Sequence, residues 1–235
     1  MPIDPATKAL LIIILAYLVG SIPFGYLVAH LWGGVDIREH GSGNIGATNV
    51  WRTLGRIPGL VTLLLDFSKG LLPVTLTLWT VPLEDFSNNG FLWASVVCLV
   101  GLAAILGHAF PVWFLFRGGK MVATGLGVMA ALIGPWVLVP LLVFGMVVTV
   151  TRYVSLGSIL AALTIPIIFV MGLYPEYQVF PKSDPAGNKV FVAFAFLAAI
   201  FVVVKHRSNL RRLANGTEPR VGSGTRTPDP GASRL

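Results

Sequence analysis

The stretch "GFLWASVVCLVGLAAILGHAFPVWFLF", residues 90–116, contains no charged side chain over a length that exceeds the thickness of a lipid bilayer. A helix needs about 20 apolar residues to cross a hydrocarbon core of about 30 Å. Residues 8–32 form a second such stretch, charged only at Lys8. The whole chain is 55% hydrophobic and 11% charged, whereas soluble domains carry about 25% charged residues. The sequence therefore predicts an all-α integral membrane protein.

The apolar segments on either side of residues 90–116 predict about seven transmembrane helices. Residues 121–150 would extend about 45 Å as one helix, which is too long for a single crossing. Two helices are expected here, because Pro135 lacks a backbone donor and clashes with the preceding turn. The first segment is expected to be a retained span, since its apolar run far exceeds that of a secretory signal. The other segments are 8–32, 57–82, 90–112, 154–174 and 189–204.

The distribution of Lys and Arg predicts the orientation of these helices, since both residues concentrate in cytoplasmic loops. With seven crossings, thirteen of them fall on one side of the membrane and three on the other. We expect the N-terminus outside and the C-terminus in the cytoplasm. This orientation, and not nucleic-acid binding, accounts for the net charge of +7. Residues 1–218 are expected to form one membrane domain, and residues 219–235, rich in Gly, Pro, Ser and Thr, a disordered tail.

In this topology the unusually polar segments all face the cytoplasm, and "GSGNIGATNVWRTLGR", residues 41–56, is the first of them. Its glycines let backbone amides approach an anion closely, and Arg52 carries a planar fork that fits phosphate. A dinucleotide site is rejected, because a membrane helix and not a strand precedes the glycines. A loop that anchors in lipid head groups is the alternative. The candidate neutral hydrogen-bonding groups are Ser42, Asn44, Thr48 and Asn49.

Two segments place further cations near the same membrane face. In "RGGK", residues 117–120, Arg117 and Lys120 flank paired glycines, which predicts an anion cradle, although the full P-loop pattern is absent. A loop that only follows the positive-inside rule is the alternative. In "DFSKG", residues 66–70, Asp66 and Lys69 are spaced to meet on one helix face. Charges within a membrane are functional candidates, although a lysine near the interface can also extend its ammonium to water.

The remaining polar segments are "RYVSLGS", residues 152–158, and "KHRSNLRRLANGTE", residues 205–218. Ser155 lies in the first, and His206 and Asn209 lie in the second. A basic helix beside the membrane usually binds anionic lipid heads, but these two neutral residues add little to such binding. Together the polar segments predict a pocket for an anionic substrate that opens to the lipid phase.

Three of these stretches, "GSGNIGATNVWR", "GHAFPVWFLFRGGK" with the following "VAT", and "KHRSNLRRLANGTE", resemble the motifs of the bacterial acyl-phosphate:glycerol-3-phosphate acyltransferases of the PlsY type. The resemblance extends over residues 8–218. It implies a cofactor-free enzyme of the inner membrane whose active site faces the cytoplasm. Such an enzyme moves a fatty acyl group from acyl phosphate to glycerol 3-phosphate, giving 1-acylglycerol 3-phosphate, and depends on a soluble enzyme that makes acyl phosphate. The sequence departs from the family pattern at Met121, where the family has glycine.

The catalytic hypothesis is orientation and charge neutralisation, because acyl phosphate is already an activated anhydride. The soluble-type pattern of a histidine with an acid five residues later is absent, and no acyl-enzyme nucleophile is evident. The proton leaves to a substrate phosphate oxygen, or His108 or His206 acts as the base. We favour a binding role for these histidines. The residues expected to hold the substrates are Arg52, Lys69 and Lys120 for phosphate, and Ser42, Asn44, Thr48, Asn49, Ser155 and Asn209 as neutral groups.

A transporter of phosphorylated metabolites is the competing class of protein, since several spans with basic loops fit it as well. Few polar residues within the spans and no visible inverted repeat argue against it. No metal site is expected, because the acids are scattered and the histidines lack ligand spacing.

Overall fold

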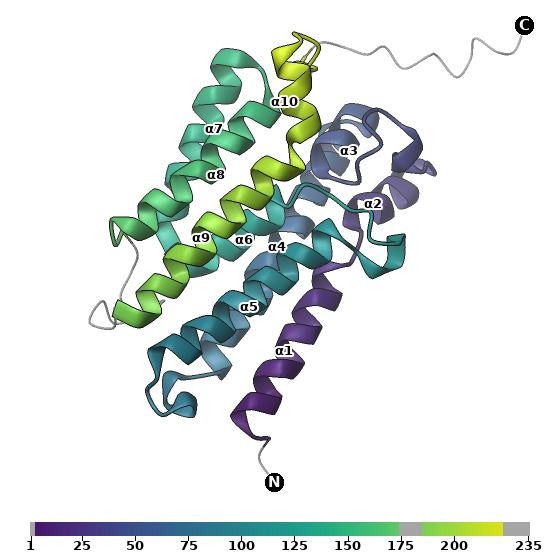
Figure 1. The fold of residues 1–235 in the computed structure, drawn as a ribbon. Coiled ribbons are helices and arrows are strands. Elements are labelled where there is room, and N and C mark those ends of the chain that lie inside the picture. The colour runs from purple at the N-terminus through teal and green to yellow at the C-terminus, as the bar shows by residue number, and fades with distance from the viewer. Residues whose placement is uncertain (1–2, 174–184, 223–235) are drawn as a thin grey trace, which may run out of the picture.

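The computed structural model describes residues 3–173 and 185–222, and every regular element within them is a helix (Figure 1). Five helical stretches are long and apolar enough to cross a membrane, which confirms the all-α membrane class expected from composition. These stretches are Pro5–Gly33, Arg56–Thr80, Gly90–Phe114, Val122–Thr151 and Ala186–Lys205. A shorter apolar helix, α8, covers Val154–Val170.

Helix α5 (Gly90–Ala109) lies at the centre of the bundle. It packs against α1 (Pro5–Gly20), α4 (Arg56–Thr80) and α9 (Pro185–Lys205). Helix α4 also packs closely against α6 (Val122–Ile133). A Cβ atom on Gly70 of α4 would lie 2.0 Å from the carbonyl oxygen of Thr124, so these two backbones approach as only small residues allow. The contact fixes α4 against the segment that follows Lys120.

Residues 8–32 were expected to form one continuous helix. The structure has two helices in this segment. Helix α1 ends at Gly20 and α2 covers Phe24–Gly33. Pro23 lies between them, and a proline cannot donate the backbone hydrogen bond that would continue α1. The carbonyl of Ile22 in this break accepts a hydrogen bond of 2.9 Å from Lys69 Nζ. Pro23 thus divides a segment that was expected to form one span.

The expected break at Gly134-Pro135 is confirmed. Gly134 has a φ of 52° and a ψ of −127°, and it separates α6 from α7 (Leu138–Thr151). The two helices extend about 18 and 21 Å, each less than the hydrocarbon core of about 30 Å. Lys120, before α6, contacts Asn209, and the carbonyl of Arg152, after α7, accepts from Val221. The chain therefore enters and leaves this helix pair at the same end of the molecule.

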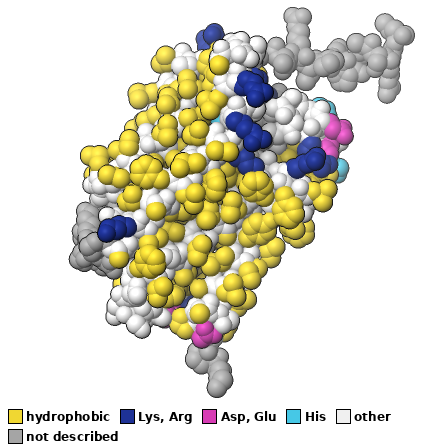
Figure 2. Space-filling view, in the orientation of Figure 1, with side chains coloured by type: hydrophobic (Ala, Val, Ile, Leu, Met, Phe, Trp, Pro, Cys, Tyr) yellow, Lys and Arg dark blue, Asp and Glu magenta, His cyan; other side chains and the backbone are white. Residues whose placement is uncertain are grey.

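The end of the bundle that carries α3 (Ala47–Leu54) and α10 (Arg207–Ala214) also carries most of the visible Lys and Arg side chains (Figures 1 and 2). A broad hydrophobic surface covers the flank of the bundle below it (Figure 2). The first residues of the predicted tail contact the rest of the protein, and the last such contact before residue 223 is the hydrogen bond from the Val221 amide to the Arg152 carbonyl. Residues 174–184, which fall mostly between the segments expected at 154–174 and 189–204, and the tail from residue 223 lie outside the described residues.

Candidate anion-binding site

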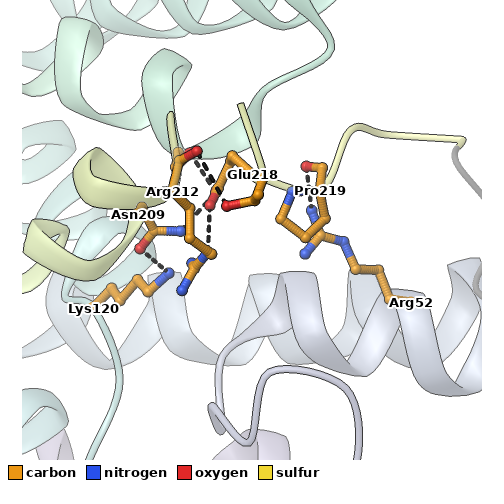
Figure 3. Close-up of polar contacts among 8 residues, drawn as sticks. Arg52, Lys120, Asn209, Arg212, Glu218 and Pro219 are labelled. Carbon is orange, nitrogen blue, oxygen red and sulfur yellow. Dashed lines mark hydrogen bonds and ion pairs between the residues drawn. The ribbon is translucent and has the colours of Figure 1, made fainter. Parts of the chain in front are cut away.

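Polar segments that are far apart in the sequence meet at this end of the bundle (Figure 3). Lys120 Nζ donates to Asn209 Oδ1 across 2.8 Å. Ser155 Oγ donates to a Glu218 oxygen across 2.6 Å. Arg52, at the end of α3, reaches the carbonyl of Pro219 at 3.4 Å. These contacts bring together the segments that carry Arg52, Lys120, Ser155 and Asn209.

Glu218 is the centre of this cluster. One carboxylate oxygen accepts from Ser155 and from Asn209 Nδ2, the latter at 2.7 Å, and the other accepts from Arg212 Nε at 2.7 Å. Burial raises the pKa of Glu218, but these three hydrogen bonds outweigh it and keep the pKa below its ordinary value. Sequence reasoning missed Glu218, whose only signal was a single acid at the end of a basic stretch.

Three cations surround that one carboxylate. Burial and the charges of Arg212 and Arg52 together lower the pKa of Lys120 to about 8, against the opposing effect of the Glu218 carboxylate. Burial also lowers the pKa of the Arg52 guanidinium. Because positive charge exceeds negative charge in a partly desolvated place, an additional anion would relieve the imbalance. The cluster is therefore suited to a phosphate group.

His206 lies beside the cluster and is almost completely buried. Its Nδ1 is 2.8 Å from the carbonyl oxygen of Val202. Since a carbonyl only accepts, Nδ1 carries the proton and Nε2 is left as an acceptor. Burial lowers the pKa of His206 to about 4, so the ring is neutral at pH 7. A neutral Nε2 can receive a hydrogen bond from a substrate hydroxyl, which is compatible with both the binding and the base hypotheses.

The loop of residues 41–46 is held in shape by the buried side chain of Asn49, which lies on α3. Its Oδ1 accepts from the backbone amide of Ser42 at 2.9 Å. Its Nδ2 donates to three carbonyls of the same region, those of Ile37, His40 and Asn44. Both polar atoms of the Asn49 side chain are thus hydrogen-bonded to backbone groups of residues 37–44. Asn49 was expected to contact substrate, but in the structure its side chain holds the backbone of this region in place.

Asn44 also acts on the loop, since its Oδ1 accepts from the amide of Gly46 at 2.8 Å. Ser42 and Thr48 of the same segment, by contrast, are exposed. Of the neutral groups expected in this segment, these two are the ones oriented toward solvent. They remain able to bind a ligand directly.

Lys69 and His108 lie apart from these exposed groups, in the interior between α4 and α5. Lys69 Nζ is 2.8 Å from Asp66 Oδ1, which confirms that the two charges meet on one helix face. His108 Nδ1 lies 3.5 Å from the same oxygen. In the described part of the chain, neither Lys69 nor His108 has a recorded hydrogen bond or ion pair with Lys120 or Asn209.

Met121, where the family pattern has glycine, adopts a left-handed backbone conformation with a φ of 69°. A residue with a Cβ atom pays about 1–2 kcal/mol for such a conformation. The Met121 side chain is 2% exposed and packs in the main hydrophobic core. The backbone thus explains the glycine of the family pattern, and burial explains how methionine is accommodated.

This chain is similar to known proteins over most of its length. Residues 10–216 match the family model for glycerol-3-phosphate acyltransferase. The glycerol-3-phosphate acyltransferase of Desulforamulus reducens is 46% identical over 212 residues, which cover 90% of this chain and 94% of the relative. That of Thermosynechococcus vestitus is 44% identical and covers 91% of this chain and 95% of its own.

A solved structure has the same fold. The crystal structure of PlsY (YgiH), an integral membrane glycerol 3-phosphate acyltransferase in its glycerol 3-phosphate form, matches with a TM-score of 0.75 and 39% identity, over 92% of this chain and 96% of that one. Its lysophosphatidic acid form matches with a TM-score of 0.74 and 38% identity.

The fold and the site define an integral membrane protein with a cluster of cationic side chains at one end of a helical bundle. The identity and coverage of its relatives place it more narrowly. The chain belongs to the glycerol-3-phosphate acyltransferase family, which confirms the resemblance noted in its sequence.

Proposed function

We propose that the protein transfers a fatty acyl group from acyl phosphate to the sn-1 hydroxyl of glycerol 3-phosphate, forming 1-acylglycerol 3-phosphate and phosphate. The observation that carries the proposal is the cluster of Arg52, Lys120 and Arg212 around a single carboxylate. Both proposed substrates carry a phosphate group, and this excess of positive charge fits one. The related PlsY structures, in glycerol 3-phosphate and lysophosphatidic acid forms, support this choice of acceptor and product.

The proposed chemistry needs no covalent intermediate on the protein. The glycerol oxygen attacks the acyl carbonyl carbon, the bond from that carbon to the phosphate oxygen breaks, and inorganic phosphate leaves with the electron pair. The hydroxyl proton passes to a phosphate oxygen or to Nε2 of His206. Holding two reactants in line lowers such a barrier by about 7–11 kcal/mol. In this proposal Lys120, Arg52 and Asn209 hold and orient phosphate, with Ser42 and Thr48 as exposed donors.

Ser155 and the two loop asparagines have supporting roles in this proposal. Ser155 donates to Glu218 and so helps to hold the carboxylate at the centre of the cations. Asn44 and Asn49 hold the loop that leads into α3 and Arg52. These three residues shape the site without contacting a phosphate themselves.

We infer further that the chain crosses the bacterial inner membrane seven times, with the N-terminus outside and the site at the cytoplasmic face. The thirteen-to-three distribution of Lys and Arg supports this orientation. The entry and exit of α6 and α7 at one end of the molecule support an even number of crossings for that pair. A cytoplasmic site would receive acyl phosphate from a soluble enzyme that makes it.

The experiment uses purified protein in detergent with palmitoyl phosphate and radiolabelled glycerol 3-phosphate. We expect labelled 1-acylglycerol 3-phosphate and inorganic phosphate in equal amounts, without any cell extract. Lys120→Ala should abolish most of the activity, while Arg117→Ala, an exposed cation of the same loop, should retain it. Product formed equally well from acyl-CoA would contradict the donor assignment. Uptake of label into proteoliposomes without any product would instead identify a transporter.

A further inference from the structure

Three ionisable side chains form a buried cluster between α4 and α5. Asp66, Lys69 and His108 are 2%, 2% and 4% exposed. Asp66 Oδ1 lies 2.8 Å from Lys69 Nζ and 3.5 Å from His108 Nδ1. The carboxylate thus pairs with Lys69 on its own helix, α4, and lies beside His108 on α5.

Stability alone does not explain such a cluster. Desolvating buried ions costs several kcal/mol for each ion, and replacing a buried ion pair by apolar residues of similar volume is often neutral or stabilising. Within a membrane protein, buried ionisable residues mark functional regions more often than structural ones. The contacts on either side of the cluster indicate which region it serves.

On one side, the imidazole of His108 supports the glycine loop, residues 118–120. A Cβ atom on Gly119 would lie 2.0 Å from His108 Nε2, so the ring touches the loop backbone directly. The amide of Gly119 donates to the carbonyl of His108 at 3.0 Å, and that of Gly118 donates to Ala109 at 3.2 Å. Lys120 follows at once in the chain. The position of its ammonium group therefore depends on where the His108 ring lies.

On the other side, Lys69 connects the cluster to the break between α1 and α2. Its ammonium donates to the carbonyl of Ile22 at 2.9 Å and lies 5.6 Å from the centre of the Phe24 ring. Helix α2 leads into the loop that carries Ser42 and then into α3 with Arg52. The same buried carboxylate is thus linked to both segments that supply phosphate-binding cations.

We infer that Asp66, Lys69 and His108 are positioning residues, which hold the glycine loop so that Lys120 faces Asn209, and that none of the three contacts substrate. The inference rests on the proposed function, which assigns phosphate binding to Lys120. Asp66 orients the imidazole, the imidazole supports Gly119, and Lys69 neutralises the carboxylate. Removing the ring moves the ammonium of Lys120 away from the phosphate.

A double-mutant cycle between His108 and Gly119 tests this arrangement. We expect His108→Ala to raise the KM for glycerol 3-phosphate about tenfold, since small misplacements of binding groups have effects of this order or larger. The pH profile of kcat should keep its shape. Gly119→Ala should raise the KM as well, because its Cβ atom collides with the ring. The double variant should have a lower KM than Gly119→Ala alone, because the ring that causes the collision is gone.

The controls separate positioning from folding and from chemistry. His30→Gln, an exposed histidine on α2, should leave both constants unchanged. Asp66→Asn with Lys69→Met keeps the approximate shape of the cluster but removes both charges of the Asp66–Lys69 ion pair. It should fold, as judged by thermal unfolding in detergent, and raise the KM more than it lowers kcat. Independent effects of the two substitutions in the cycle would overturn the inference. A large fall in kcat with a lost titration step in His108→Ala would do so too, by making His108 a base.

The same variants keep the inference testable if the proposed reaction fails. A wild-type protein that forms no product from acyl phosphate would sink the proposed function only. Binding of glycerol 3-phosphate to the purified variants, measured by calorimetry, would still report on the position of Lys120. His108→Ala should bind it about tenfold more weakly than wild type, and equal affinity would contradict the positioning role.

Discussion

Lys120 Nζ lies 2.8 Å from Asn209 Oδ1, although 89 positions separate the two residues in the chain. The amide of Asn209 is oriented, because its nitrogen donates to Glu218 while its oxygen accepts from the lysine. A neutral group therefore stands between the cation and the carboxylate. Lys120 keeps its positive charge without a direct ion pair to Glu218, which leaves it available to a phosphate.

Phosphate binding should weaken as pH rises through the pKa of Lys120, which is about 8 in the ligand-free protein. Only the protonated ammonium attracts phosphate, so affinity is complete below this pKa and lost above it. We expect the KM for glycerol 3-phosphate to rise about tenfold for each pH unit well above that range. Steady-state kinetics between pH 6.5 and pH 9.5 measure it. Lys120→Arg should remove the rise, and a flat wild-type profile would contradict the assignment.

Glu218→Gln should lower both stability and the pKa of Lys120. The carboxylate accepts from three side chains, and hydrogen bonds to a charged group contribute about 1.5–3 kcal/mol each. Its negative charge also raises the pKa of Lys120. The thermal midpoint in detergent should fall, and the alkaline rise in KM should begin at lower pH. Glu39→Gln, exposed and outside the site, is the matched control. An unchanged alkaline rise would exclude electrostatic coupling of Glu218 to Lys120.

Arg52→Lys should weaken substrate binding although it preserves the charge. A guanidinium binds phosphate through two parallel N–H groups, whereas an ammonium is a single point of contact. We expect the KM for glycerol 3-phosphate to rise about tenfold, the equivalent of 1.4 kcal/mol. Arg56→Lys, an exposed residue at the start of α4, should behave as wild type. Equal KM values for Arg52→Lys and wild type would show that charge alone suffices.

His206→Gln separates the two roles considered for this histidine. The pKa of His206 is about 4, so the ring stays neutral throughout the range from pH 5.5 to pH 8. If His206 binds substrate, the glutamine variant should lose affinity and keep the wild-type dependence of kcat on pH. Loss of a wild-type acidic limb near pH 4, below that range, together with a fall in kcat of about 100-fold or more would establish general-base catalysis instead.

Met121→Gly should destabilise the protein even though it relieves backbone strain. Glycine in a left-handed conformation recovers about 1–2 kcal/mol, but removing a buried methionine costs about 2–5 kcal/mol. The thermal midpoint in detergent should therefore fall. Leu115→Gly is the matched control, because Leu115 is also left-handed, with a φ of 49°, and is 85% exposed. That substitution should leave the midpoint unchanged or raise it, and a similar fall in both variants would contradict the role of burial.

The helical membrane fold could be predicted from composition and segment length. A hydrocarbon layer requires long apolar helices that satisfy their own backbone hydrogen bonds, and this requirement acts on each segment separately. The break at Gly134-Pro135 was predictable for the same local reason. The break at Pro23 was also local, but the strength of the surrounding apolar run concealed it.

The sequence also predicted an anionic ligand, because glycines beside Arg52 and Lys120 are a local pattern. It indicated which polar stretches meet at one end of the bundle. The sequence did not indicate that the Asn49 side chain hydrogen-bonds the loop before α3, or that Lys69 and His108 lie buried beneath the glycine loop.

Only the tertiary structure decided that Glu218 stands at the centre of the cations and that Asn209 connects it to Lys120. Helix formation and membrane insertion depend on neighbours within a few turns, so the order of residue types determines them. The partners of a side chain at a helix end depend on how distant segments pack, and residue types alone do not encode that packing in any local pattern.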